Sequence, residues 1–346
     1  MARRSGTGGV VRLRDVAARA GVSSGTVSNT INHPERVRPH TRKIVSEAIE
    51  ALGYVPNQQA RMLTGAPSEV IGLVVLDVES PFYMAAAHAV ERGVRESGHA
   101  IMLCTSEGDL EREEALLRML AAQGVRGAML APATPDADAD RYRSLPRSLP
   151  VVLLDFDGGG THCSVSVDNL LGGRLAARHL VALGHERIAF VGGPAHIRQF
   201  SERADGVRAE LRDAARDPGA DLVEVAASGI GIRDGQEAAE LLLRDGTMPS
   251  ALVCGNDMLA FGVYRALVGA GVRVPEDVSV IGYDDIDVAK DWIVPLTTIR
   301  QPIAELGQSA ADLLLEHSAG DPEHRHRQVV LRPELVVRRS TAAPPA

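Results

Sequence analysis

The sequence predicts an α/β protein in which a small helical N-terminal unit precedes a large body built on doubly wound parallel sheets. Two short helical patterns flank a tight turn within residues 13–31. From residue 70 onward, short β-branched runs alternate with amphipathic helical stretches, which is typical of parallel sheets covered by helices on both faces. Charge divides the chain similarly: residues 1–66 hold ten Lys or Arg and four Asp or Glu, a net of +6, whereas the remainder holds 27 against 41, a net of −14. A basic unit on an acidic body is expected where only the small unit meets phosphate.

The first helical pattern has one apolar face and a clear end. Leu13, Val16, Ala17 and Ala20 recur at helical spacing, which predicts that this face is buried. Gly21 follows, and the left-handed backbone conformation that ends a helix is easiest for glycine.

The second helix is expected to begin after Ser23, a favourable N-cap, and to turn Val27 and Ile31 inward. Its outer face is small and polar, and it carries Ser24, Gly25, Thr26, Ser28 and Asn29. Such a face suits close approach to base edges in the DNA major groove. The alternative is an ordinary helical hairpin, because motifs of this kind also arise by accident.

Two further helices complete the predicted N-terminal unit. Pro39 suits the first position of a helix that runs to Leu52 and is ended by Gly53. Asn57 can then cap a short helix that reaches Leu63. A helix of that length is marginal alone in water, so we expect it to form only against DNA and a partner copy.

Long, ordered segments of the chain resemble the LacI/GalR family of bacterial transcription regulators. They are Asp15-Val-Ala-Ala-Arg-Ala-Gly-Val-Ser, Thr26-Val-Ser, Ala48-Ile-Glu-Ala-Leu-Gly-Tyr-Val-Pro-Asn, Ala60-Arg-Met-Leu, Ile281-Gly-Tyr-Asp-Asp and Leu296-Thr-Thr-Ile-Arg-Gln-Pro. The resemblance covers nearly the whole chain, to about Ser340. It implies a helix-turn-helix headpiece followed by a core of two similar subdomains, like a periplasmic sugar-binding protein, with three chain crossings near residues 167, 297 and 327.

These considerations give the expected domain boundaries. The headpiece is residues 1–56, the hinge helix and linker are 57–66, the effector-binding and dimerisation core is 67–340, and the tail 341–346 is expected to be disordered. Within the core, subdomain one takes residues 67–167 and 298–326, and subdomain two takes 168–297 and 327–340.

Eight runs in the body are predicted as strands. They are Val70 to Asp77, Ala100 to Ser106, Gly127 to Ala131, Val151 to Phe156, Arg187 to Gly192, Leu222 to Ala226, Ala251 to Gly255 and Val278 to Tyr283. Helical patterns separate them except across 157–167, where a glycine-rich loop precedes Val165-Ser-Val. Eight such units exceed one ordinary sheet, which favours two sheets.

Several classes of protein are disfavoured. No run of 18 apolar residues and no apolar signal core follow the N-terminus, so we expect a cytoplasmic protein without a membrane span. Cys104, Cys163 and Cys254 are far apart and fit reduced thiols without metal spacing. His324-Arg-His-Arg is interpreted as a solvated loop. No dinucleotide, phosphate-loop or nucleophile-elbow pattern follows a strand, so we expect no cofactor, no metal and no enzyme activity.

Polar residues at strand ends predict a ligand site, because ligands of open α/β sheets bind at the carboxyl ends of the strands. The candidates are Asp155, Arg203, Asn256, Asp284 and Gln301, which together could hydrogen-bond a ring of hydroxyls. They match the effector positions that the family resemblance implies. The alternatives are structural: Asp284 and Asn256 could cap the next turn or helix, and Arg203 could form a surface ion pair.

One lip of this site is expected after the first strand, where Ser80, Phe82 and Met84 offer edge or apolar contacts. Ile230 stands about where the family often has an aromatic residue, so it can pack on a ligand but cannot stack. A sugar fits the polar set best. A purine is less favoured, because only 3% of the chain is aromatic.

The resemblance implies a homodimeric repressor that binds a palindromic double-stranded DNA operator and responds to a small cytoplasmic ligand. Asn29 is the candidate for a base contact, Ser24 for a single bond, and Gly25 for close approach. Residues expected at phosphates are Thr26, Ser28, Asn32, Tyr54 and Asn57. By resemblance, Leu63 wedges into the central base step, Ala60 lets two hinge helices approach, and Trp292 lies near the dimer interface, with core packing as its alternative.

Other interpretations remain open. Regulation could instead depend on a purine corepressor or a partner protein. From other classes of protein, a soluble sugar-binding protein would explain the body but not the basic N-terminal unit. A sugar-processing enzyme would need a general acid and base that the strand ends do not show.

Overall fold

The computed structural model describes residues 11–55, 68–133, 149–244, 246, 248–321 and 323–345. The chain forms two compact units, Met1–Ser68 and Glu69–Ala346. Within the described residues, no helix is both long and apolar enough to cross a membrane.

The first unit is a small helical bundle. Its elements are α1 (Leu13–Ala20), α2 (Ser24–Asn32), the 3-10 turn η1 (Pro34–Arg36) and α3 (Pro39–Leu52). The predicted helix ends are confirmed. Gly21 and Gly53 end α1 and α3 with φ of 66° and 60°. The Ser23 side chain caps α2 by accepting a hydrogen bond from the Thr26 amide at 3.1 Å. The core of the bundle is formed by Val16, Ala17, Val27, Val45 and Ala48.

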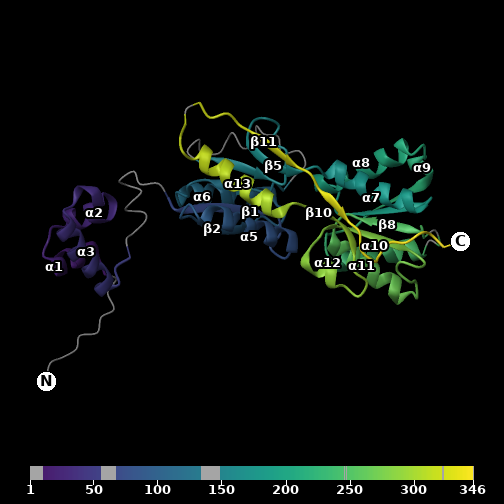
Figure 1. Ribbon diagram of the computed structural model, residues 1–346, viewed down its shortest axis with the longest axis horizontal. Helices are drawn as coiled ribbons and strands as arrows, with labels where there is room; N and C mark the ends of the chain where they lie inside the picture. Colours follow the sequence, from purple (N-terminus) through teal and green to yellow (C-terminus); the bar gives the residue numbers. More distant parts are fainter. Residues whose placement is uncertain are drawn as a thin grey trace, which may run out of the picture. The chain divides into compact units, whose positions relative to one another are not determined.

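The second unit contains two six-stranded sheets (Figure 1). Sheet A has the order β11-β5-β4-β3-β1-β2, and all its neighbouring strands are parallel. Its strands are β1 (Val70–Val75), β2 (Ala100–Thr105), β3 (Ala128–Leu130), β4 (Val151–Leu154), β5 (Cys163–Val167) and β11 (Gln328–Leu331).

Sheet B has the order β12-β10-β9-β8-β6-β7, and only the β12–β10 pair is antiparallel. Its strands are β6 (Ile188–Gly192), β7 (Leu222–Ala226), β8 (Ala251–Cys254), β9 (Ser279–Asp284), β10 (Thr297–Arg300) and β12 (Glu334–Val336). The predicted doubly wound, two-sheet architecture is therefore confirmed, although β5, β10, β11 and β12 were not among the eight predicted strands.

Helices cover both faces of each sheet. On sheet A, α5 (Pro81–Arg95) and α13 (Ile303–His317) share one core, whereas α6 (Leu110–Ala122) packs in the other. On sheet B, α7 (Asn169–Leu183) and α8 (Arg198–Asp213) lie on one face, and α10 (Ile232–Arg244) and α11 (Asp257–Gly269) on the other (Figure 1). Two short helices, α9 (Pro218–Asp221) and α12 (Asp287–Asp291), complete this half.

Side chains of a central strand alternate between the cores on the two faces of sheet A. In β1, Leu73 and Val75 pack in the core with α5, whereas Val74 packs in the core with α6. The central strands β1, β3 and β4 are buried on both faces, which is why these runs are nearly continuous in apolar residues.

The chain crosses between the sheets three times, and two predicted crossing points need correction. The first crossing follows β5, as expected near residue 167. The second comes after Arg300 rather than near 297, because β10 pairs with β9 in sheet B. The third comes after Leu331 rather than near 327, because β11 pairs with β5 in sheet A. Neither β10 nor β11 was predicted as a strand, so both crossings were expected a few residues too early.

The predicted disorder of the tail is wrong for its first residues. Thr341 contacts the His179 Nε2 at 2.9 Å, and the Ala342 amide donates to Ser279 Oγ at 3.0 Å. The Ala342 carbonyl also lies 2.9 Å from the His185 Nε2. These bonds hold the segment against sheet B.

Trp292 packs within the second unit. Its ring stacks on Phe261 with centroids 4.2 Å apart and meets Tyr264 edge-on at 6.2 Å. The side chain joins the core beside α11. Within one copy of the chain, Trp292 therefore has the core-packing role that was the alternative to a place at the dimer interface.

Candidate functional site

The outer face of α2 is polar and accessible. Ser24, Gly25 and Asn29 are exposed, whereas Val27 and Thr30 point into the bundle. Within the described residues, the Asn29 side chain makes no hydrogen bond, so its amide is available to an external partner.

The residues of α2 that were predicted to contact phosphates are half-buried, and their side chains form hydrogen bonds with neighbouring residues of the helix. Thr26 Oγ1 lies 3.0 Å from Ser23 Oγ at the helix start. Asn32 Nδ2 contacts Ser28 Oγ at 3.3 Å, while the buried Asn32 Oδ1 has no partner among the described residues. These side chains are ordered by the helix itself.

Four further predicted DNA-binding residues follow α3. Tyr54 is half-buried and packs against the core of the helical bundle. Asn57, Ala60 and Leu63 lie outside the described residues, so their predicted roles remain predictions.

A small polar chamber lies between the two sheets of the second unit. It has a volume of about 40 Å³. It is lined by Leu76, Ser80, Phe82, Tyr83, Asp155, Ile197, Gln199, Phe200, Arg203, Ile230, Asn256 and Asp284. A wider cleft of about 420 Å³ adjoins it and shares Leu76, Ile197 and Ile230. The chamber is thus the floor of a larger opening.

Two buried carboxylates face the polar chamber. Asp155 directly follows β4 and Asp284 ends β9, so both lie at carboxyl ends of strands. Burial raises the pKa of Asp155 to about 7 and that of Asp284 to about 6, although the nearby Arg203 lowers both. The backbone φ is 53° at Asp155 and 114° at Asp284, a region that L-residues rarely adopt. Strain and desolvation are tolerated together here, as is common at functional sites.

The buried Arg203 guanidinium supplies the opposite charge. Its Nε donates to Asn169 Oδ1 at 2.9 Å, and its Nη1 donates to the Gly255 carbonyl at 2.6 Å. The group also stacks on the Tyr283 ring, 3.7 Å from the centroid. Arg203 lies inside α8, and among the described residues it forms none of the surface ion pairs that were the alternative.

Two amide side chains hold the carboxylates in place. Gln199 Nε2 donates to Asp155 Oδ2 at 3.1 Å, and Gln301 Nε2 donates to Asp284 Oδ1 at 2.7 Å. Asp155 Oδ1 and Gln301 Oε1 are buried acceptors with no partner in the part of the chain that the structure describes. Asp155 lines the chamber, so its unpaired acceptor favours a ligand that brings a donor.

Asn256 serves a structural role and also faces the chamber. Its Oδ1 accepts from the Leu259 amide at 2.8 Å, which caps α11, and its Nδ2 donates to the Ile230 carbonyl at 3.1 Å. The capping alternative is therefore what the structure shows for this residue.

The polar chamber gathers seven of the nine predicted effector residues: Ser80, Phe82, Asp155, Arg203, Ile230, Asn256 and Asp284. Met84 does not line it, and its side chain is 43% exposed on α5. Gln301 lies behind Asp284 and is not in the lining. Two lining residues on α8, Gln199 and Phe200, were not predicted from the sequence. Both precede Arg203 on the same helix at helical spacing, so the periodicity around Arg203 could have indicated them.

Comparison with known proteins agrees with both units. Residues 12–57 match the model of bacterial regulatory proteins of the lacI family, and residues 177–341 match the periplasmic binding protein-like domain. The chain is 34% identical to the HTH-type transcriptional repressor PurR of Photobacterium profundum, covering 95% of this chain and 98% of the relative. It is 36% identical to the ribose operon repressor of Escherichia coli, over 95% and 99%.

A solved structure of a Lac repressor dimer, bound to operator and the anti-inducer ONPF, is also similar. The TM-score is 0.85 at 31% identity, and the match covers 96% of this chain and 99% of that one. The helical unit, the two-sheet body and these full-length matches agree. The chain belongs to the lacI family of bacterial regulatory proteins and is a DNA-binding transcriptional regulator.

Proposed function

We propose that this regulator is a homodimeric repressor whose affinity for a palindromic operator is controlled by a sugar bound in the polar chamber. The observation that carries the proposal is the pair of buried carboxylates, Asp155 and Asp284, facing one chamber beside the buried Arg203. A family of repressors with full-length similarity supplies the DNA-binding half of the proposal.

The chemistry of the polar chamber suits hydroxyl groups. A hydroxyl can donate to a carboxylate and accept from a guanidinium, and such charge-assisted bonds are short and strong. Asp155 Oδ1 lacks a donor among the described residues. Phe82 and Phe200 give the lining an apolar surface against which a sugar ring can pack.

A purine base remains the second candidate, and the composition of the lining strengthens it. Phe82, Tyr83 and Phe200 all line the chamber, so aromatic surface is concentrated here even though it is scarce in the chain. Aromatic rings stack on flat ligands, and the carboxylates would accept from ring N–H groups. The low aromatic content of the whole chain therefore does not weigh against a purine in this chamber.

Ligand entry requires the polar chamber to widen. Its 40 Å³ hold only about three water molecules, whereas ligand pockets measure roughly 300–1,000 Å³. The adjoining cleft of about 420 Å³ is large enough. Since the two openings share residues from both sheets, movement of one sheet against the other would join them.

The ligand class can be tested by calorimetry on the full chain with D-ribose, D-galactose, cellobiose, adenine, guanine and hypoxanthine. We expect one sugar to bind, and Asp284→Asn to abolish that binding, whereas Asp312→Asn on the exposed side of α13 leaves it intact. We also expect the sugar to be recovered unchanged, because the proposal contains no catalytic step. Binding of a purine alone, or equal binding by the Asp284 variant, would contradict the sugar assignment.

The DNA side of the proposal assigns base contacts to the exposed face of α2. Asn29 would bond an adenine edge, Ser24 would add a single bond, and Gly25 would permit close approach. Selection of genomic fragments, followed by titration at fixed salt, should yield a palindrome. Asn29→Ala should then lose discrimination at one base pair per half-site, worth about 1–3 kcal/mol.

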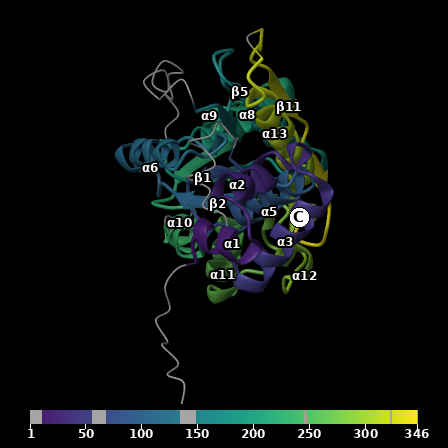
Figure 2. The ribbon, with the colours of Figure 1, turned by 90° about the vertical axis from the view of Figure 1, so that its left-hand side faces the viewer.

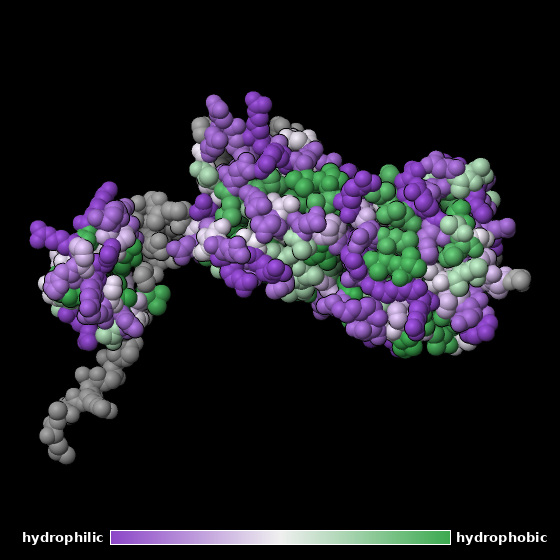
Figure 3. Space-filling view, viewed as in Figure 1, coloured by the Kyte–Doolittle hydropathy of each residue, from purple (hydrophilic) through white to green (hydrophobic). Residues whose placement is uncertain are grey.

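Dimerisation is supported by exposed apolar surface on the second unit, which is grouped in patches on the face shown in Figure 3. Exposed apolar side chains of this unit include Met84, Val268, Ile293 and Val337, which are 43%, 51%, 82% and 57% exposed. Surfaces of this kind mark protein contacts when they are contiguous. Sedimentation equilibrium should give twice the chain mass, and a monomer at operator-binding concentrations would refute the dimer.

A further inference from the structure

One cysteine and three histidines lie together beside sheet A, outside the polar chamber. Cys163 is the first residue of β5, His317 is the last of α13, and His324 and His326 lie in the segment that leads into β11. In both ribbon views α13, β5 and β11 lie side by side (Figures 1 and 2). One ligand atom from each residue lies within 4.8 Å of all the others.

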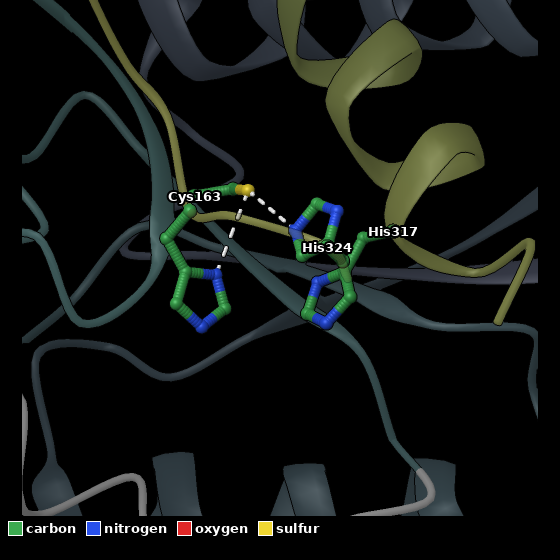
Figure 4. A group of neighbouring side chains, drawn as sticks. Cys163, His317 and His324 are labelled. Atoms are coloured by element: carbon green, nitrogen blue, oxygen red, sulfur yellow. Dashed lines mark hydrogen bonds between the residues drawn. The ribbon is translucent and has the colours of Figure 1, made fainter. Parts of the chain in front are cut away.

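The contacts of Cys163 have the spacing of a metal centre. Its Sγ lies 3.3 Å from His324 Nε2 and 3.7 Å from His326 Nδ1. Figure 4 shows the sulfur directed toward the His324 ring. In a tetrahedral zinc site, Zn–S of about 2.3 Å and Zn–N of about 2.0–2.1 Å place sulfur and nitrogen about 3.5 Å apart.

His317 provides the fourth donor. Its ring stacks on His324 with centroids 4.3 Å apart, and its buried Nδ1 has no partner among the described residues. A neutral imidazole nitrogen that lacks a hydrogen-bond partner keeps a lone pair that a metal can accept. Separations near the 4.8 Å limit would have to shrink by up to about 1.4 Å to close a tetrahedron.

We propose that Cys163, His317, His324 and His326 form a binding site for Zn²⁺, with one thiolate and three imidazoles as its ligands. A thiolate with imidazoles in tetrahedral array suits Zn²⁺ better than the oxygen-seeking Mg²⁺ or Ca²⁺. Binding forms the sulfur–zinc bond as the thiol proton leaves to solvent, and no electron is transferred. Four protein ligands leave no open position, which is typical of a structural site.

The site is separate from the polar chamber. Cys163 begins β5, whereas Asp155 follows the parallel neighbour β4, so the two groups lie at opposite ends of the strands of sheet A. The metal would tie the end of α13 and the following segment to β5, next to the strand from which the chain makes its last crossing. Arg327 flanks the site, but it is paired with Glu316.

The sequence held a signal that spacing rules for zinc motifs miss. Alternate residues of an extended segment point to the same side, so His324 and His326 face one way. The β5–β11 register pairs Ser164 with Gln328, which brings the start of β5 beside the residues preceding β11. The interpretation of this segment as a solvated loop did not include the pairing of β11 with β5, which brings both histidines to Cys163.

The test uses the full, untagged chain, stripped with a chelator, reloaded with ZnCl₂ and passed through gel filtration. Elemental analysis should find one zinc per chain. Loss of even an outer partner of a metal ligand weakens binding about 10–100-fold, so Cys163→Ser and His326→Gln should each weaken it by more than about tenfold. Cys104→Ser and the exposed His88→Gln are matched controls that should retain zinc.

A second readout identifies the ligands. Co²⁺ loaded in place of Zn²⁺ should show the intense visible bands of a tetrahedral ion and a thiolate charge-transfer band that Cys163→Ser removes. His326 is exposed, so we expect its variant to fold. That variant therefore tests zinc binding even if Cys163→Ser does not fold. Failure of the parent chain to retain zinc, equal retention by the His326 variant, or a cobalt spectrum without thiolate character would each overturn the assignment.

Discussion

Replacing Asp155 with asparagine should make the second unit more stable at high pH and leave it unchanged at low pH. Asp155 is buried, and burial raises its pKa from an ordinary 3.8 to about 7. The folded state therefore binds a proton that the unfolded state releases between about pH 4 and 7, so stability falls as pH rises through that window. Because asparagine cannot ionise, the free energy of unfolding of the variant does not fall over this pH range.

The size of the effect follows from the pKa of Asp155. The interval from 3.8 to about 7, at about 1.4 kcal/mol for each pH unit, corresponds to a penalty on the order of 4 kcal/mol above pH 7 and none below pH 4. Asparagine also tolerates the left-handed backbone at this position, where φ is 53°. The substitution thus changes charge with little change in shape. Burial is the largest cause of the raised Asp155 pKa, and the charge of Asp284 is a smaller one.

The assay is urea unfolding at pH 4.5 and pH 8, followed by tryptophan fluorescence. Trp292 is the only tryptophan of the chain and packs against Phe261, so its emission reports on sheet B. The exposed Asp312→Asn is the control and should follow the parent protein at both pH values. An Asp155→Asn difference that is equal at both pH values would refute the reasoning about the buried charge.

Three further substitutions test the packing that supports both units. Gly173→Ala would place a Cβ 2.0 Å from a backbone oxygen of α8, so we expect a loss of about 1–3 kcal/mol in the unfolding free energy, measured in urea. Ser23→Ala removes the cap on the Thr26 amide and should cost the first unit about 1 kcal/mol, seen as a lower melting temperature by circular dichroism. Thr298→Val removes the 2.6 Å hydrogen bond to the buried Asp257 carboxylate and should cost about 1–3 kcal/mol, with no loss expected if that carboxylate were solvated.

Much of the fold could be predicted because its determinants are local. The buried strands of a parallel sheet are continuous apolar runs, and the helices of the first unit are bounded by Gly21, Ser23 and Gly53. The strands next to the chain crossings, β5, β10, β11 and β12, could not be predicted in this way. β10 begins with Thr297, whose hydroxyl is bonded to the returning C-terminal segment, so its burial depends on a distant part of the chain.

The candidate sites show the same limit. The rule that ligands meet strand ends found Asp155 and Asp284, because strand ends are visible in the sequence. It could not find Gln199, which reaches the chamber from a helix and is placed by the packing of α8. The cluster of Cys163 with three histidines was missed for the same reason, since its members meet only after β11 pairs with β5.

Hydrogen bonds connect the polar chamber to the chain crossings. They give a route by which a ligand in the chamber would affect the crossings. Asp284 lies in the chamber and accepts a hydrogen bond from Gln301, at the second crossing. The adjacent Asp285 accepts from Arg300 at 2.6 Å and from Arg338 at 2.5 Å, which lie beside the second crossing and after the third. Both aspartates have positive φ, so the backbone between them is strained. A ligand that draws Asp284 away from Gln301 would therefore alter the crossings directly, and only its differential affinity for the two arrangements could drive the change.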